Sequence, residues 1–205
     1  MKNEHILAID NKVFSHLDTL AQQVFYFYDF QVNQRDIVIM QRDRLEKDPT
    51  YRQVIPYTVV ANELGEVFVY RRTAKAGDSR LHNQDSIGFG GHLDLIDVVH
   101  NDSVISLEGS IARCSDREMQ EELGISGNSE VFAYIVDDST EVNRVHVGAL
   151  SLLEVEKSQV SLESKEEGIE VLGWFRPSDL DTANLESWSQ LATEVLSSAI
   201  EGELL

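Results

Sequence analysis

The stretch from Arg117 to Ile125, Arg-Glu-Met-Gln-Glu-Glu-Leu-Gly-Ile, carries three carboxylates within five residues. A helix advances about 100° per residue, so Glu118, Glu121 and Glu122 would lie on one face of it. Like charges at this spacing destabilise a helix, so the arrangement calls for a neighbouring cation. A hard divalent ion with oxygen ligands, such as Mg²⁺, would supply that charge. The sequence therefore predicts a divalent-metal site, with a solvated acidic face as the plain alternative.

Three features near this stretch favour ligand binding. The glycines of segment 88–91 allow a tight turn and a close approach to a ligand. A cluster of four basic residues in an otherwise acidic chain suits a polyphosphate, and equally suits an exposed hairpin end. The cluster consists of Arg71, Arg72, Lys75 and Arg80. Arg117 could also orient Glu118 through a charge-assisted hydrogen bond.

Composition limits the classes of partner. The 205 residues include 36 Asp and Glu against 17 Lys and Arg, which gives a net charge of −19. Such a surface repels nucleic-acid backbone and anionic membranes, so neither DNA, RNA nor a membrane is expected as a partner. No apolar run approaches the ~20 residues of a membrane span, and the N-terminus does not resemble a signal peptide. A single cysteine, Cys114, excludes an internal disulfide and fits a reducing cytoplasm.

The elements that must position these residues follow from hydrophobic periodicity. The pattern predicts an α/β layered domain over residues 51–205, preceded by an N-terminal extension over residues 1–50. The central helix would span 107–123, with Gly124 as its cap, and a second amphipathic helix would pass through 185–199. Residues 92–106 are expected to form a loop. The predicted strands are 37–40, 55–61, 67–70, 86–89, 131–136, 145–153 and 169–175. Cys114 and His146 are expected in the core.

The motif of residues 117–125 resembles the Nudix hydrolase signature, Arg-Glu-hydrophobic-x-Glu-Glu-x-Gly-hydrophobic, at every position. The resemblance extends over about residues 55–180. The surrounding basic, histidine and Gly-Gly positions look like a bacterial and phage subgroup of predicted Nudix phosphoesterases, which also has an N-terminal extension. The resemblance implies an α/β/α sandwich around a mixed β-sheet.

The resemblance also implies roles for individual residues. Glu118, Glu121 and Glu122 would bind Mg²⁺ or Mn²⁺, and Arg117 would hold Glu118. One of these glutamates, with Glu121 and Glu122 as candidates, or one from a later acidic loop would act as base on the attacking water. In that loop Glu166 and Glu167 are favoured, and both could also bind metal. The substrate would be a nucleoside diphosphate linked to another group, contacted by Arg71, Arg72, Arg80, His82, Gly90, Gly91 and His92.

One departure from the family pattern concerns the start of the helix. The family usually has a further Glu eight positions before the Arg and a Gly six before that, where this chain has Gly109 and Ser103. Glu108 lies one residue early, so its contribution stays open. The segment after Gly91 is roughly eleven residues longer than the family spacing, which indicates an insertion.

Two other functions remain as alternatives. The departure at Gly109 would fit a catalytically weak Nudix-like module that binds or senses a nucleotide. An isomerase of the isopentenyl-diphosphate type would need a cysteine within 86–92, and none is present. Specificity would lie in residues 1–50, 92–106 and 137–143, which carry no readable code. The sequence does not identify the diphosphate substrate, and it leaves a homodimer open.

Overall fold

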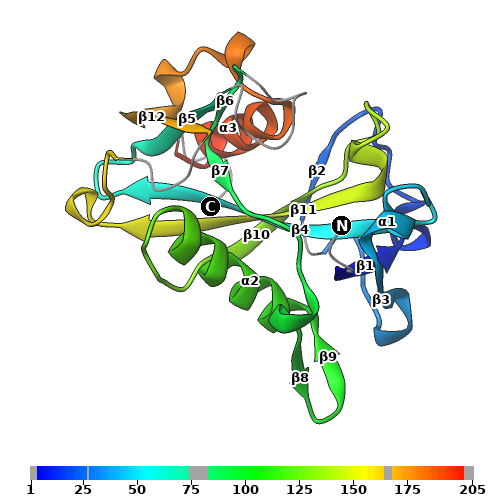
Figure 1. Ribbon diagram of the computed structural model, residues 1–205. Coiled ribbons are helices and arrows are strands. Elements are labelled where there is room, and N and C mark those ends of the chain that lie inside the picture. The colour runs from blue at the N-terminus through cyan, green and yellow to red at the C-terminus, as the bar shows by residue number, and fades with distance from the viewer. Residues whose placement is uncertain (1–3, 27, 74–82, 164–167, 201–205) are drawn as a thin grey trace.

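The computed structural model describes residues 4–26, 28–73, 83–163 and 168–200, with side chains up to residue 197. Four predicted site residues, Arg80, His82, Glu166 and Glu167, lie outside this part of the chain. The described strands form a ten-stranded mixed sheet and a separate two-stranded hairpin (Figure 1).

The main path through the sheet runs β12-β5-β4-β11-β10-β2. The strands on it are β2 (Val24–Phe25), β4 (Tyr51–Asn62), β5 (Val67–Arg72), β10 (Glu130–Ile135), β11 (His146–Val155) and β12 (Ile169–Phe175). At its centre β4 and β11 run parallel, in register from Gln53 opposite His146 to Asn62 opposite Val155. The other neighbours on this path pair antiparallel. The predicted mixed sheet is thus confirmed.

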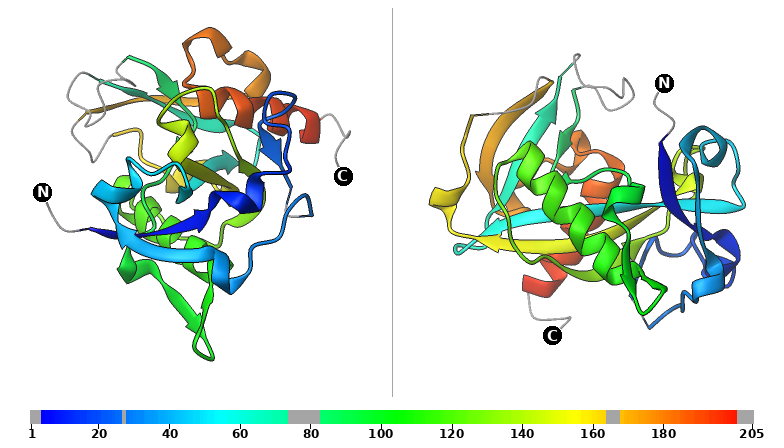
Figure 2. Two further views of the ribbon diagram at one scale, coloured as in Figure 1. Left: turned by 90° about the vertical axis from the view of Figure 1, so that its right-hand side faces the viewer. Right: turned by 60° about the horizontal axis from the view of Figure 1, so that its bottom comes forward.

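Two helices cover opposite faces of this sheet, α2 (Leu107–Glu122) and α3 (Ser187–Ile200) (Figure 2). Side chains alternate along a strand, so successive residues of β4 contact different helices. Thr58 hydrogen-bonds Ser115 of α2, with 2.7 Å between their hydroxyl oxygens. Tyr57 packs edge to face on Trp188 of α3. The molecule therefore has the α/β/α layering that the resemblance implied. No helix in the described ranges is long and apolar enough to cross a membrane.

The N-terminal segment adds strands to the same sheet. β1 (His5–Asp10) pairs antiparallel with β3 (Ile37–Gln41), and its end pairs with the start of β4, Ala8 opposite Gln53. A short helix, α1 (Arg42–Leu45), follows β3 and leads towards β4. The boundary proposed at residue 50 stays a prediction.

Residues 92–106 depart from the predicted loop. They contain a 3-10 turn at Leu95–Asp97 and the hairpin β8 (Val99–Asn101) and β9 (Val104–Ser106), which leads directly into α2 (Figure 1). The hairpin turns at Asp102 and Ser103, which both adopt positive φ, as tight hairpin turns require. The loop prediction was wrong because these strands are short and interrupted by polar residues, which hides their alternation.

The remaining predicted elements lie within a few residues of their observed positions. Strand 86–89 is divided into β6 (Asp85–Ser86) and β7 (Gly88–Phe89). Gly124 ends α2 at φ +72°, as predicted, and Cys114 is fully buried.

Candidate active site

The helix α2 begins and ends with local capping contacts. The Ser106 hydroxyl accepts a hydrogen bond from the Gly109 amide at its start. At its end the amides of Leu123 and Gly124 both donate to the carbonyl of Met119, each at 3.0 Å. Met119 is buried, so it anchors the last turn of α2 in the core. The same turn carries glutamates of the cluster described below.

The turn after β7 lies against both β4 and α2. A Cβ on Gly90, which has φ +157°, would lie 1.8 Å from the carbonyl oxygen of Pro56. A Cβ on Gly91 would lie 2.4 Å from Oε1 of Glu118. At Gly90 the clash is with backbone, so only glycine fits there, whereas a side chain at Gly91 would displace the Glu118 carboxylate. The Gly-Gly pair therefore forms one wall of the space that holds the Glu118 carboxylate.

Arg117 connects the carboxylates of the cluster. Its Nη1 donates to Oε1 of Glu118 at 2.6 Å and to Oε2 of Glu121 at 3.4 Å. Its Nε and Nη2 donate to the two carboxylate oxygens of Asp97, at 3.0 and 2.8 Å. Such a two-pronged pair fixes the guanidinium plane as well as its position. The Arg117–Glu118 contact expected from the sequence is present.

Burial divides the three glutamates. The side chain of Glu118 is 13% exposed and that of Glu121 is 62% exposed. Glu122 is half-buried, with one carboxylate oxygen shielded from solvent. Burial raises the pKa of Glu118, against the opposing effect of Arg117. The hydrogen bonds to Asp97 raise the pKa of Arg117, so this guanidinium stays charged.

The two described arginines of the basic cluster point to different partners. Arg71 pairs with Asp85, at 2.6 Å from Nε to Oδ1 and 3.1 Å from Nη2 to Oδ2. Arg72 donates to the hydroxyl of Tyr70 at 2.8 Å. Tyr70 and, to a smaller extent, Glu122 raise the pKa of Arg72 against the opposing effect of burial. Substrate binding by Arg71 and Arg72 stays a prediction.

His92 contributes its backbone to the cluster and its side chain to another site. Its carbonyl accepts from Nη2 of Arg117 at 3.4 Å. Its ring lies against His146, with 3.3 Å between the two Nε2 atoms. Burial lowers the pKa of His92 to about 3, helped by the charges of Arg42 and His146. His146 is buried, as predicted.

Sequence reasoning missed Asp97. It comes from the 3-10 turn at the start of the insertion and is 1% exposed. The only local sequence pattern that involves Asp97 is the Asp94-x-x-Asp97 spacing of a capping box. This pattern does not predict a contact with Arg117. Glu108, by contrast, is exposed in the first turn of α2.

The only potential metal ligands that the three glutamates offer are carboxylate oxygens. Glu118 and Glu122 are partly buried, and the absence of a side chain at Gly91 leaves room for the Glu118 carboxylate. This donor set suits a hard divalent cation. Oxygen ligands beside a fixed guanidinium could also hold a phosphate-bearing ligand through a shared metal ion.

No protein-family model matches the chain. Protein YmaB of Bacillus subtilis (strain 168) is 38% identical over 167 residues, which cover 77% of each chain. The crystal structure of Tm1382, assigned to the Nudix hydrolases, superposes with a TM-score of 0.70 at 26% identity, over 96% of this chain and 100% of that one. A MutT protein from Methanosarcina mazei Go1 gives a TM-score of 0.42 at 15% identity, over 73% and 96% of the two chains.

The likeness to Tm1382 covers nearly the whole chain, and the signature of residues 117–125 lies on the helix that carries the carboxylate cluster. The chain therefore shares both the Nudix signature and the fold of Tm1382, which supports its membership of the Nudix hydrolases.

Proposed function

We propose that this hydrolase uses Mg²⁺ or Mn²⁺ to cleave the phosphoanhydride bond in a nucleoside diphosphate that is linked to another group. The observation that carries the proposal is the set of inward-facing carboxylates at Glu118 and Glu122 beside the fixed guanidinium of Arg117. In a chain of net charge −19, such carboxylates are stabilised by a cation.

The chain's own residues have separate tasks in this proposal. Arg117 fixes one oxygen of Glu118 and leaves the other available as a metal ligand. Glu122 and Glu121 supply further oxygens, and the exposed Glu121 can also reach a substrate or a water. A bound Mg²⁺ or Mn²⁺ would neutralise the diphosphate and lower the pKa of the attacking water. Glu121, Glu122 or a residue of the later loop, Glu166 or Glu167, would take the proton from that water.

Binding of a polyphosphate needs local positive charge on this acidic surface. The basic cluster around Arg71 and Arg72 is the candidate, because Arg72 donates to the hydroxyl of Tyr70, which in turn donates to the carbonyl of Gly88 in the glycine-rich segment. The Gly90–Gly91 turn would let a diphosphate approach the backbone closely. The single cysteine fits a cytoplasmic enzyme.

The test offers purified protein a panel of nucleoside diphosphate derivatives with Mg²⁺ or Mn²⁺ and follows products by mass spectrometry. Glu122→Gln should lower kcat by about 100-fold or more, which corresponds to about 2.7 kcal/mol of transition-state stabilisation. Glu130→Gln, an exposed carboxylate on β10, is the matched control and should keep full activity. Equal turnover by wild type and Glu122→Gln would disprove the proposed role of the cluster.

The same panel distinguishes the second candidate, a catalytically weak module that binds a nucleotide. Gly109 stands where the family usually has a glutamate, and a Cβ there would lie 2.9 Å from the Ser106 hydroxyl. Thermal stabilisation by a nucleotide with no product formed would favour this candidate over the enzyme.

A further inference from the structure

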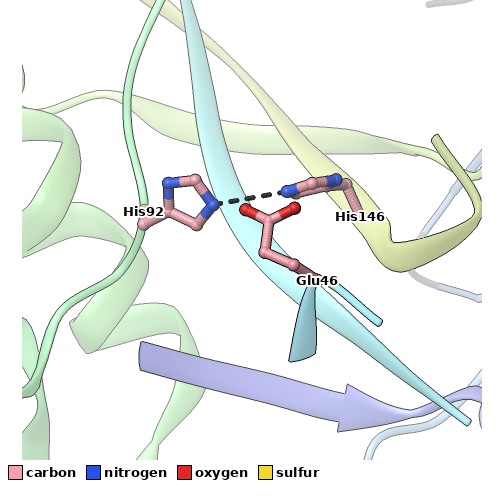
Figure 3. Close-up of side chains that lie close together, drawn as sticks. All are labelled: Glu46, His92 and His146. Atoms are coloured by element: carbon pink, nitrogen blue, oxygen red, sulfur yellow. Dashed lines mark hydrogen bonds between the residues drawn. The ribbon is translucent and has the colours of Figure 1, made fainter. Parts of the chain in front are cut away.

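Three side chains from distant parts of the chain meet beside the Gly-Gly turn: Glu46, His92 and His146 (Figure 3). One potential ligand atom from each lies within 4.8 Å of those of the other two. Glu46 follows α1, His92 follows the Gly-Gly turn, and His146 begins β11. The proposed active site uses none of these three side chains.

The imidazole of His146 is arranged as a metal ligand often is. Nδ1 of His146 lies 2.7 Å from the carbonyl oxygen of Val142. A carbonyl only accepts, so Nδ1 carries the proton, and in the neutral ring Nε2 presents its lone pair towards His92. Metal-binding histidines usually donate their other ring N–H to a carbonyl or carboxylate in this way.

The spacing of the rings fits a single ion. The Nε2 atoms of His92 and His146 are 3.3 Å apart. Two nitrogens that each lie about 2.05 Å from one tetrahedral Zn²⁺ are separated by about 3.3 Å. A direct N–H···N hydrogen bond between the rings has a similar length, and the metal titration below distinguishes the two arrangements.

Glu46 supplies the carboxylate that the pair of rings needs. Its side chain is 37% exposed, so an ion bound here could be reached from solvent. Its Oε1 accepts from Nε of Arg42 at 3.3 Å, which leaves Oε2 for an ion. Arg42 also pairs with Glu4 at 3.2 Å, so its charge is shared between two carboxylates.

We propose that Glu46, His92 and His146 form a second metal site that takes a divalent transition-metal ion, with Zn²⁺ as its best fit. Two imidazole ligands favour Zn²⁺ over Mg²⁺, which prefers oxygen. The ion joins the segment after α1 to the core strand β11 and to the Gly-Gly turn. Because the carbonyl of His92 contacts Arg117, the ion also holds the backbone beside the active site.

The experiment titrates Zn²⁺ into the full-length, chelator-treated protein in excess Mg²⁺, which occupies carboxylate-only sites, against a chromophoric chelator. Wild type should take up one equivalent with a rise in Tm, since a ligand that binds only the folded state stabilises it. Co²⁺ should give the visible absorption of four-coordinate nitrogen and oxygen ligation. Both readouts are independent of hydrolysis, so a failure here is distinct from a failure of the proposed function.

Variants assign the ligands. His146→Gln should weaken Zn²⁺ binding by about 100-fold and the exposed Glu46→Gln by about tenfold, within the range that metal-site substitutions cause. Glu46→Gln keeps the test informative if His146→Gln fails to fold. The controls His100→Gln, exposed on β8, and Glu118→Gln should bind Zn²⁺ as wild type does. Absence of uptake by wild type, or a loss in Glu118→Gln but not in Glu46→Gln, would overturn the proposal.

Discussion

At the scale of single residues, Gly91 is a position where function and stability should separate. A Cβ there would meet Oε1 of Glu118 at 2.4 Å, which is a side-chain atom and not part of the backbone. In Gly91→Ala the Glu118 carboxylate would move, and the backbone conformation would stay the same. We expect hydrolysis to fall by about tenfold or more, and the free energy of unfolding to change by less than about 1 kcal/mol.

Gly127→Ala is the matched control for this substitution. Its added Cβ would also meet the end of a side chain, Cδ1 of Leu153 at 2.6 Å, but its nearest neighbours include no glutamate atom. Activity should be unchanged in this variant. A full loss of folded protein in Gly91→Ala, measured by circular dichroism, would contradict the prediction that activity falls while stability is kept.

Asp97 should act on the reaction through Arg117. Asp97→Asn removes the charge that holds the guanidinium but can keep the hydrogen bond from the amide of Asp94, now 3.1 Å long. We expect kcat or the affinity for Mg²⁺ to fall by about 10–100-fold, the usual effect of losing a residue that orients a ligand. Asp94→Asn, which alters the same turn without touching Arg117, should retain activity. Unchanged metal dependence in Asp97→Asn would argue against this role.

The residues that the sequence could and could not predict differ in how far apart they are along the chain. Arg117, Glu118, Glu121 and Glu122 lie within two helical turns, so helix geometry alone places them together. Asp97 reaches Arg117 across twenty residues and a hairpin, and no local period encodes that contact. The pairing of His92 with His146 spans an even longer segment and was equally invisible.

At the scale of elements, Arg52 on β4 joins the N-terminal segment to the loop before β11. Arg52 is 2% exposed, and its guanidinium donates to Asn11 at 2.7 Å and to Asp138 at 2.6 Å. It also donates to the carbonyls of Asn143 at 3.1 Å and His146 at 3.3 Å. One buried side chain thus satisfies acceptors from two separate segments.

Replacing Arg52 with Met keeps much of the volume and removes every donor. The carboxylate of Asp138 would keep only the hydrogen bond from Thr19, and the other acceptors would lose the donor that Arg52 supplies, which costs about 3 kcal/mol. In a chain of this size that lowers Tm by roughly 6–12 °C, measurable by calorimetry. Arg35→Met, at a side chain that is 86% exposed, should change Tm little. A similar Tm for both variants would show that the hydrogen bonds of Arg52 contribute little to stability.

The elements themselves were predictable where one physical signal dominated. β4 and β11 are rich in β-branched and apolar residues, and α2 and α3 carry apolar stripes and, for α2, a glycine cap. The hairpin β8–β9 was missed because three-residue strands give too few alternations to detect. The pairing of β1 with β4 could not be read either, since it joins Ala8 to Gln53 across a long segment.

At the scale of the whole molecule, the charge of −19 acts on stability as well as on partners. Like charges repel more strongly in the compact state than in the expanded chain, so the acidic surface destabilises the fold. Salt shortens the range of this repulsion, from about 30 Å at 0.01 M to about 10 Å at 0.1 M. The buried pairs of Arg117 and Arg52 are screened much less.

We therefore expect Tm to rise with NaCl in the presence of a chelator, by a few degrees, because about 1 kcal/mol shifts Tm by roughly 2–4 °C in a chain of this length. Differential scanning calorimetry between low and moderate salt measures the slope. A triple variant that replaces the exposed Glu130, Glu141 and Glu154 with Gln should start from a higher Tm and respond less to salt, since part of the repulsion is already removed. A Tm that falls with salt would instead mean that exposed ion pairs contribute more to stability than the excess of negative charge takes away.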